Sequence, residues 1–140
     1  MDDYTKKMID EFPVKLKSTD TATTPASNNL FEKGAEKKLD KKRAEAFHTT
    51  AAQALFMGKR VRPDIQQAIL VLCTRVKEPN ESDWQKLIRL MKYLNGTRKK
   101  YLTLSADDLR VIKWYVDASF AVHPDFKSHT GAVMTMGNGA

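Results

Sequence analysis

The sequence predicts an α+β fold in which a small three-helix bundle precedes a β-hairpin. Over residues 44–97 the hydrophobic side chains recur at the i, i+3, i+4 spacing of amphipathic helices. Residues 111–122 instead form an almost continuous apolar run, rich in β-branched and aromatic residues, as in a strand. With 140 residues, the chain is long enough to bury one core of ordinary domain size.

Three parts are predicted along the chain: a short helix with a Ser/Thr/Pro-rich connector at 1–43, the helical bundle at 44–100 and the hairpin at 101–140. In the first part, a helix that stops at Pro13 is indicated by the spacing of Tyr4, Met8, Ile9 and Phe12. Ten of the fourteen residues in 16–29 are Ser, Thr, Asp, Pro or Asn, which is typical of an extended connector.

The charged stretch 32–47 mixes both signs at helical spacing and favours a solvent-exposed helix. Three amphipathic helices are then predicted near 44–58, 63–77 and 83–95. Their hydrophobic stripes should pack together because each helix alone exposes an apolar face. The side chains predicted to lie inside are Ile65, Ile69, Leu72, Trp84, Leu87, Ile88 and Met91.

Boundary residues support these helices. Pro63 suits the first turn of the second helix, where its missing N–H costs nothing. Ser82 and Gln85 have the spacing of a capping box at the start of the third helix. Gly96 stands where a left-handed residue would end that helix.

The last part is predicted to be a hairpin with a short strand before it. Residues 101–105 indicate that short strand, and 111–122 a longer one buried on both faces. Residues 123–128 contain the turn formers Pro and Asp, and 129–137 are predicted to be the returning strand.

The net charge of +7 is concentrated in the middle of the chain. Residues 47–77 carry a net charge of +4 and residues 86–113 carry +6. A clustered basic surface attracts polyanions such as nucleic acids, although a lysine-rich face that is merely solvated explains such runs equally well. The candidate nucleic-acid-binding residues are Lys59, Arg60, Lys86, Arg89, Lys92, Arg98, Lys99 and Lys100.

Several classes of protein are excluded by what the sequence lacks. No run approaches the ~20 apolar residues of a membrane span, and the acidic N-terminus does not resemble a secretory signal. One cysteine and three histidines cannot build an internal disulfide or a zinc finger. There is no glycine-rich phosphate-binding loop. We expect an intracellular protein that does not enter membranes, with cytoplasm and nucleus both open.

Asp117 is the candidate metal-binding residue, because a carboxylate within an apolar strand is costly to bury without a partner. The alternative is an Asp at the exposed end of the strand. Asp107 and Asp108 are adjacent in a polar loop and are predicted to be turn residues. A catalytic triad is disfavoured, since its only candidates crowd one strand end: Ser119, His123 and Asp125.

Seven short features occur in a defined order: Thr24-Pro25, FHTTA (47–51), RPDI (62–65), Trp84, YLNGT (93–97), YVDAS (115–119) and SHTG (128–131). In order and spacing they resemble the Pol polyprotein of copia-type LTR retrotransposons, from just after the reverse transcriptase palm into the ribonuclease H. The resemblance covers nearly the whole chain.

The resemblance implies a role for each part. The helices would be the polymerase thumb and connection, which grip a primer–template duplex, and the hairpin would start an RNase H-like sheet. Asp117 matches the first catalytic carboxylate, a ligand for Mg²⁺ or Mn²⁺ during hydrolysis of RNA in an RNA–DNA hybrid. The implied partners are an RNA–DNA hybrid or DNA duplex, bound by its backbone, and the remainder of the Pol polyprotein.

The chain departs from the family pattern at both active sites. The Tyr-x-Asp-Asp motif of the polymerase is absent, and the later carboxylates of the ribonuclease are not found. We therefore expect that the chain alone has neither RNA-directed DNA polymerase nor ribonuclease H activity and holds no metal. Two alternatives stay open: a stand-alone basic helical module that binds nucleic acid, and a non-functional relic that only folds.

Overall fold

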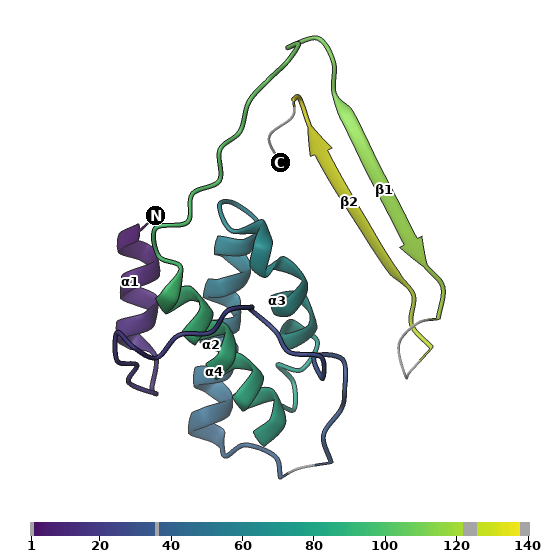
Figure 1. Ribbon diagram of the computed structural model, residues 1–140. Helices are drawn as coiled ribbons and strands as arrows, with labels where there is room; N and C mark the ends of the chain where they lie inside the picture. Colours follow the sequence, from purple (N-terminus) through teal and green to yellow (C-terminus); the bar gives the residue numbers. More distant parts are fainter. Residues whose placement is uncertain (1, 36, 122–125, 138–140) are drawn as a thin grey trace. The chain divides into compact units, whose positions relative to one another are not determined.

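The computed structural model describes residues 2–35, 37–121 and 126–137. The chain forms two compact units, Met1–Tyr101 (the helical unit) and Leu102–Ala140 (the hairpin unit). The described residues form four α-helices and one two-stranded antiparallel sheet, which confirms the α+β class (Figure 1). The helices are α1 (Asp2–Glu11), α2 (Lys41–Gly58), α3 (Gln66–Cys73) and α4 (Glu81–Gly96), and a 3-10 turn (Pro63–Ile65) precedes α3.

The first helix ends just before Pro13, as the sequence predicts. The prediction of an exposed helix over 32–47 is wrong for the first part of this range, because α2 begins only at Lys41. Asp40 caps α2 by accepting a hydrogen bond from the Arg43 backbone N–H. The residues before Asp40 instead bond to the start of α4: the Leu39 N–H donates to the Pro79 carbonyl, and the Lys37 carbonyl accepts from the Glu81 N–H.

The second predicted helix is shorter than 63–77, since α3 ends at Cys73. There the Thr74 hydroxyl donates to the Val71 carbonyl at 2.7 Å, and such a local hydrogen bond competes with those that would continue the helix. The capping box of α4 is also not the predicted one. It is formed by Asn80 and Asp83, each of whose side chains accepts from the other's backbone N–H.

The core is built by all four helices around the predicted stripes. Six of the seven predicted core side chains are at most 3% exposed. The seventh, Ile88, is only partly buried because it faces an open groove described below. α1 adds three side chains that are not among the predicted core residues: Met8, Ile9 and Phe12. Phe12 stacks on Trp84 with ring centroids 5.5 Å apart.

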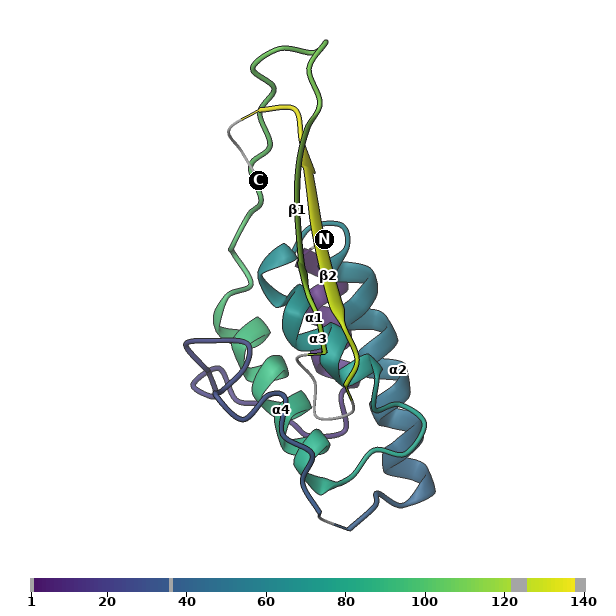
Figure 2. The same ribbon diagram turned by 90° about the vertical axis from the view of Figure 1, so that its right-hand side faces the viewer.

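The connector between α1 and α2 lies along α4 and runs antiparallel to it (Figures 1 and 2). At the end of α4, the Asn95 amide donates to the carbonyls of Lys17 and Asp20, at 2.8 and 3.1 Å. At the start of α4, the Asn80 amide donates to the Gly34 carbonyl at 2.7 Å. The connector is therefore part of the helical unit and not a free linker.

Gly96 has a different role from the predicted left-handed cap. It lies within α4, Thr97 follows as the C-cap, and no described glycine has a positive φ. A Cβ at position 96 would come within 2.9 Å of the Thr21 Cβ. Glycine is therefore required there because the connector approaches the helix closely.

The hairpin unit contains β1 (Lys113–Ser119) and β2 (His129–Thr135), paired antiparallel with Asp117 opposite Gly131. Both strands agree with the predicted hairpin. The predicted strand at 101–105 is wrong, since these residues have no regular structure. The predicted turn lies partly outside the described residues, which omit 122–125.

The expected burial of β1 on both faces is also wrong. Trp114, Tyr115 and Val116 are 63%, 63% and 68% exposed, because no further strand or helix of the hairpin unit covers them within the described residues. Among the described helices, none is long and apolar enough to cross a membrane.

Candidate nucleic-acid interface

An open groove of about 470 Å³ lies between the connector and α4. Most of its lining side chains carry hydroxyl, amide or cationic groups, two are apolar and none is a carboxylate. The lining residues are Thr21, Ala22, Thr23, Gln85, Ile88, Arg89 and Lys92. We call this the α4 groove. Hydrogen-bond donors together with two positive charges are the chemistry that receives a phosphate group.

Arg89 has unused hydrogen-bonding capacity in the α4 groove. Its Nη2 donates to the Thr24 hydroxyl at 3.0 Å. Its Nε is buried and has no hydrogen-bond partner among the described residues. A buried N–H without an acceptor is unfavourable, so an anion that enters the groove would relieve this cost.

The spacing of three residues along α4 explains how they line the groove together. Gln85, Arg89 and Lys92 are four and three residues apart and so lie on one face of the helix. The prediction that Lys86 lies on the same solvent face is wrong, because this residue is 8% exposed and its Nζ donates to the Glu32 carbonyl at 2.6 Å. Lys86 holds the connector, so we leave it out of the interface.

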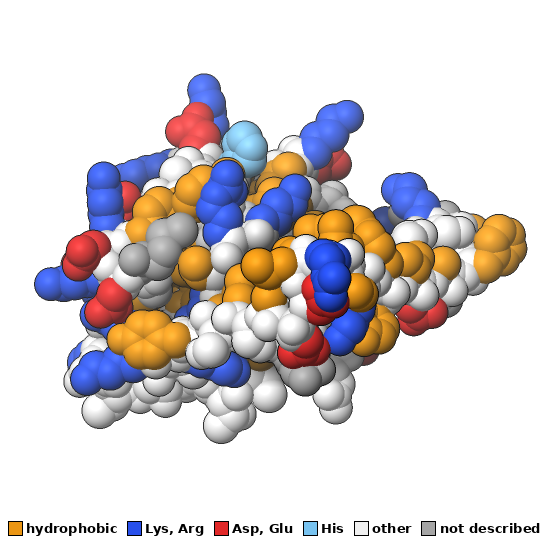
Figure 3. All heavy atoms as spheres, turned by 90° about the horizontal axis from the view of Figure 1, so that it is seen from above, with side chains coloured by type: hydrophobic (Ala, Val, Ile, Leu, Met, Phe, Trp, Pro, Cys, Tyr) orange, Lys and Arg blue, Asp and Glu red, His pale blue; other side chains and the backbone are white. Residues whose placement is uncertain are grey.

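The other predicted basic residues gather at one end of the helical unit, where α2 and α4 both end. Lys59 and Arg60 are exposed after α2, and the Arg60 guanidinium lies 4.1 Å from the centre of the Phe56 ring. After α4, Lys99 is exposed and Arg98 donates to the Asn95 side chain at 2.9 Å. On the face drawn in Figure 3, basic side chains stand in several places among hydrophobic and acidic ones.

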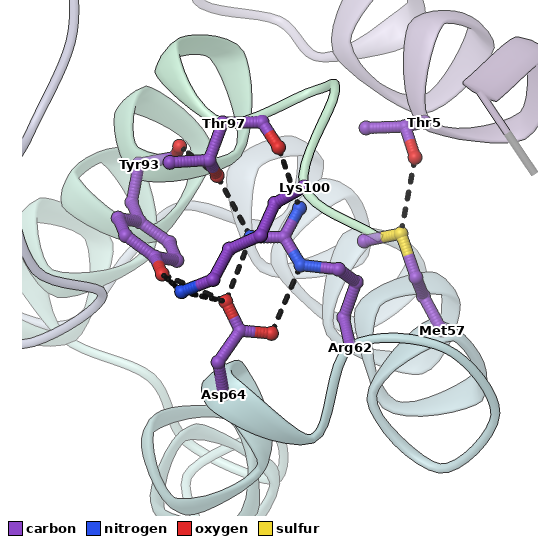
Figure 4. Close-up of polar contacts among 7 residues, drawn as sticks. All are labelled: Thr5, Met57, Arg62, Asp64, Tyr93, Thr97 and Lys100. Atoms are coloured by element: carbon purple, nitrogen blue, oxygen red, sulfur yellow. Dashed lines mark hydrogen bonds and ion pairs between the residues drawn. The ribbon is translucent and has the colours of Figure 1, made fainter. Parts of the chain in front are cut away.

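A polar cluster joins the turn before α3 to the end of α4 (Figure 4). Arg62 is 4% exposed, and its Nε and Nη2 donate to the two carboxylate oxygens of Asp64 at 2.9 and 2.8 Å. The same guanidinium donates to the hydroxyl and the carbonyl of Thr97, at 2.7 and 3.1 Å. We call this set the Arg62–Asp64 clasp.

Tyr93 and Lys100 complete the clasp. The Tyr93 hydroxyl donates to Asp64 at 2.7 Å, and the Lys100 ammonium lies 3.6 Å from the same carboxylate oxygen. Burial by itself would raise the pKa of Asp64, but the hydrogen bonds and positive charges around it outweigh burial and lower the pKa to about 2. Lys100 is therefore already engaged, although it remains exposed.

The clasp gives a physical role to two of the family-like motifs. Arg62 and Asp64 belong to RPDI, and Tyr93 and Thr97 belong to YLNGT, so the two motifs meet although about thirty residues separate them. Among the described residues, no buried side-chain polar atom of the clasp lacks a hydrogen-bond partner. These motifs therefore act in holding the helices together, and the chemistry that reaches solvent comes from other residues.

Asp117 is exposed on β1, where its backbone pairs with Gly131, and its side chain has no hydrogen-bond or ion-pair partner among the described residues. Nor do the described residues contain any group of three His, Cys, Asp or Glu side chains that could hold a metal ion. This donor set does not fit a held Mg²⁺ or Mn²⁺, which needs several converging oxygens. Of the unfavoured triad, His123 and Asp125 lie outside the described residues.

Comparison with known proteins relates the whole chain to retrotransposons. It is 25% identical, over 98% of its length, to a retrovirus-related Pol polyprotein from transposon TNT 1-94 of Nicotiana tabacum. It is 26% identical, over 100% of its length, to a putative transposon Ty5-1 protein of Saccharomyces cerevisiae. The chain spans 10% and 44% of the lengths of these two relatives. No family model and no solved structure matches. The resemblance to retrotransposon Pol proteins is thereby confirmed.

Proposed function

We propose that this chain is a segment of a copia-type retrotransposon Pol polyprotein, and that its helical unit binds the backbone of a primer–template duplex. The observation that carries the binding role is the α4 groove, which Arg89 and Lys92, both partly exposed, line together with two threonines. The buried, unpartnered Nε of Arg89 supports a ligand that accepts hydrogen bonds. The whole-chain similarity to retrotransposon proteins supports nucleic acid as that ligand.

In this proposal a backbone phosphate enters the α4 groove and accepts hydrogen bonds from Arg89 and Lys92. The basic end of the helical unit, with Lys59, Arg60 and Lys99, contacts phosphates further along the duplex. Such contacts fix the position of the duplex and carry no sequence information. Each neutralised phosphate releases counterions, so the affinity falls steeply as salt is raised.

We expect the full chain to bind a labelled RNA–DNA hybrid in fluorescence anisotropy, with an affinity that falls between low and physiological salt. Arg89→Gln combined with Lys92→Gln should weaken binding equally for hybrids of different sequence. It should also reduce the slope of log Kd against log salt by about 1, because the single phosphate held by both side chains accounts for roughly one released counterion.

The matched control is Lys41→Gln combined with Lys42→Gln, which removes the same charge from exposed positions in the first turn of α2. This control should change the slope much less. Equal effects of the two double variants would contradict the groove assignment. A wild-type chain that binds no hybrid even at low salt would favour the relic hypothesis.

For the hairpin unit, we propose that it corresponds to the start of an RNase H-like sheet, with Asp117 in the place of the first carboxylate. We expect no cleavage of a labelled RNA–DNA hybrid by this chain in Mg²⁺ or Mn²⁺, because one carboxylate cannot fix a metal ion and aim its water. The assay includes Asp117→Asn as control. Turnover by the wild-type chain that disappears in this variant would contradict the prediction.

A further inference from the structure

Thr24 of the connector contacts Arg89 at the edge of the α4 groove. Its hydroxyl accepts a hydrogen bond from Arg89 Nη2 at 3.0 Å and donates one to the Ala26 carbonyl at 2.7 Å. The Thr24 residue is exposed, and Arg89 is partly exposed. Both residues belong to the helical unit, so this contact does not involve the hairpin unit.

The Arg89 guanidinium uses only part of a paired set of donors. In the Arg62–Asp64 clasp, Nε and Nη2 of Arg62 donate side by side to the two oxygens of one carboxylate. In Arg89, Nη2 donates to the one oxygen of the Thr24 side chain, whereas Nε is buried and has no partner among the described residues. A group with several acceptor oxygens on Thr24 would satisfy both donors, as phosphates paired with arginine do.

The sequence around Thr24 offers a means of adding such a group. Thr24 precedes Pro25, and no other serine or threonine of the chain is followed by proline. Proline-directed kinases modify a serine or threonine before proline, and they bind it in an extended backbone. Proline disfavours the helical conformation in the residue before it, and none of residues 20–27 lies in a helix or strand.

We propose that Thr24 is a phosphorylation site, and that its phosphate pairs with Arg89 and closes the α4 groove to nucleic acid. In the modifying step, the Thr24 Oγ attacks the γ-phosphorus of ATP, the bond to the bridging oxygen of ADP breaks, and the hydroxyl proton is released. The closing of the groove rests on the proposed function, because it blocks the side chains assigned there to a backbone phosphate.

The charges of the α4 groove explain why this phosphate would exclude another one. A phosphothreonine carries about −1.5 to −2 charges at pH 7 and three acceptor oxygens. It faces the positive charges of Arg89 and Lys92, and no carboxylate is among the lining side chains. The bond from Thr24 to the Ala26 carbonyl is lost with the proton, but charge-assisted bonds from Arg89 are stronger. A duplex phosphate would then meet a negative group in place of free donors.

The first test treats the full chain with a proline-directed kinase and ATP and locates the phosphate by mass spectrometry. The wild-type chain should gain one phosphate, on Thr24. The control is Thr24→Val, which keeps the shape of the side chain but has no hydroxyl, and it should gain none. A wild-type chain that stays unmodified, or a phosphate that appears equally in the control, would overturn the proposal.

The second test measures the contact with Arg89 without any nucleic acid. In a ³¹P NMR titration, the pKa of the phosphate on Thr24 should lie below its ordinary value of about 6, because a neighbouring cation favours the dianion. Arg89→Gln should bring this pKa back, and Lys41→Gln, which removes an exposed charge in α2, should not. Unfolding the phosphorylated wild-type chain in urea should also bring it back, a measurement that does not depend on a variant folding. An ordinary pKa in the folded wild-type chain would overturn the pairing.

The third test compares the binding of a labelled RNA–DNA hybrid before and after kinase treatment. Phosphorylation should weaken binding about as much as Arg89→Gln combined with Lys92→Gln does, and treatment should not change the binding of Thr24→Val. Equal affinities of the two wild-type forms would overturn the closing of the groove. A chain that binds no hybrid before treatment would contradict the proposed function, whereas the ³¹P titration still decides whether the phosphate pairs with Arg89.

Discussion

Replacing Trp84 by alanine is expected to lower the free energy of unfolding of the helical unit by about 3–5 kcal/mol. The Trp84 ring is 3% exposed and stacks on Phe12 of α1. The Arg43 guanidinium of α2 lies 4.9 Å from the centre of the same ring. The substitution thus removes the contacts by which α4 holds two other helices and leaves a cavity that they cannot fully close.

Urea unfolding followed by far-ultraviolet circular dichroism would measure this loss. The matched control is Trp114→Ala in the hairpin, where the same side chain is 63% exposed. Because exposed substitutions have small effects, this control should change the unfolding of the helical unit by less than about 0.5 kcal/mol. Equal losses in the two variants would contradict the burial of Trp84 as the cause.

Apolar periodicity predicted the parts of the fold that depend on local sequence. The stripes on α3 and α4 were found because a buried helical face repeats about every 3.6 residues, whatever covers it. The hairpin strands were found because β-branched and aromatic residues concentrate there. The ends of the helices were less predictable. Asn80 and Ser82 are both good capping residues, and only the folded chain shows that the Asn80 side chain also bonds to the connector.

The contacts between distant segments could not be predicted. The connector 16–29 has the composition of a free loop, yet its carbonyls and hydroxyls bond to α4. Gly96 is needed because this stretch approaches α4 closely at Thr21, and Lys86 is buried because it bonds to the Glu32 carbonyl in the residues that follow. A backbone that offers hydrogen-bond acceptors leaves no periodic signal in its sequence.

Only one side of the α4 groove could be predicted from the sequence, for the same reason. Arg89 and Lys92 were identified from their place on α4, but the opposing Thr21 and Thr23 come from the connector and had no signal as binding residues. The Arg62–Asp64 clasp was missed altogether, although two polar residues beside the buried Ile65 could have suggested a paired charge.

Breaking the Arg62–Asp64 clasp is also expected to lower the free energy of unfolding strongly. Asp64→Ala should lower the free energy of unfolding of the helical unit by about 3 kcal/mol, because it leaves the buried Arg62 cation without its carboxylate. The matched control is Glu78→Ala, which breaks an ion pair with Lys38 whose side chains are 65% and 70% exposed. An exposed pair of this kind contributes less than about 1 kcal/mol. Similar losses in both variants would contradict the role of the clasp.

The same variant should change the pH dependence of stability in a defined direction. The pKa of Asp64 is about 2 in the folded chain, against an ordinary value of 3.8, so its ionised form favours folding. This contribution amounts to about 2 kcal/mol, is complete above about pH 5 and is lost as the pH falls through 3.8 towards 2. The stability difference between wild type and Asp64→Ala should therefore shrink over that range. Other carboxylates titrate in both proteins, so their effects cancel in the difference. A stability difference that stays constant down to pH 2 would show that the clasp does not lower the pKa of Asp64.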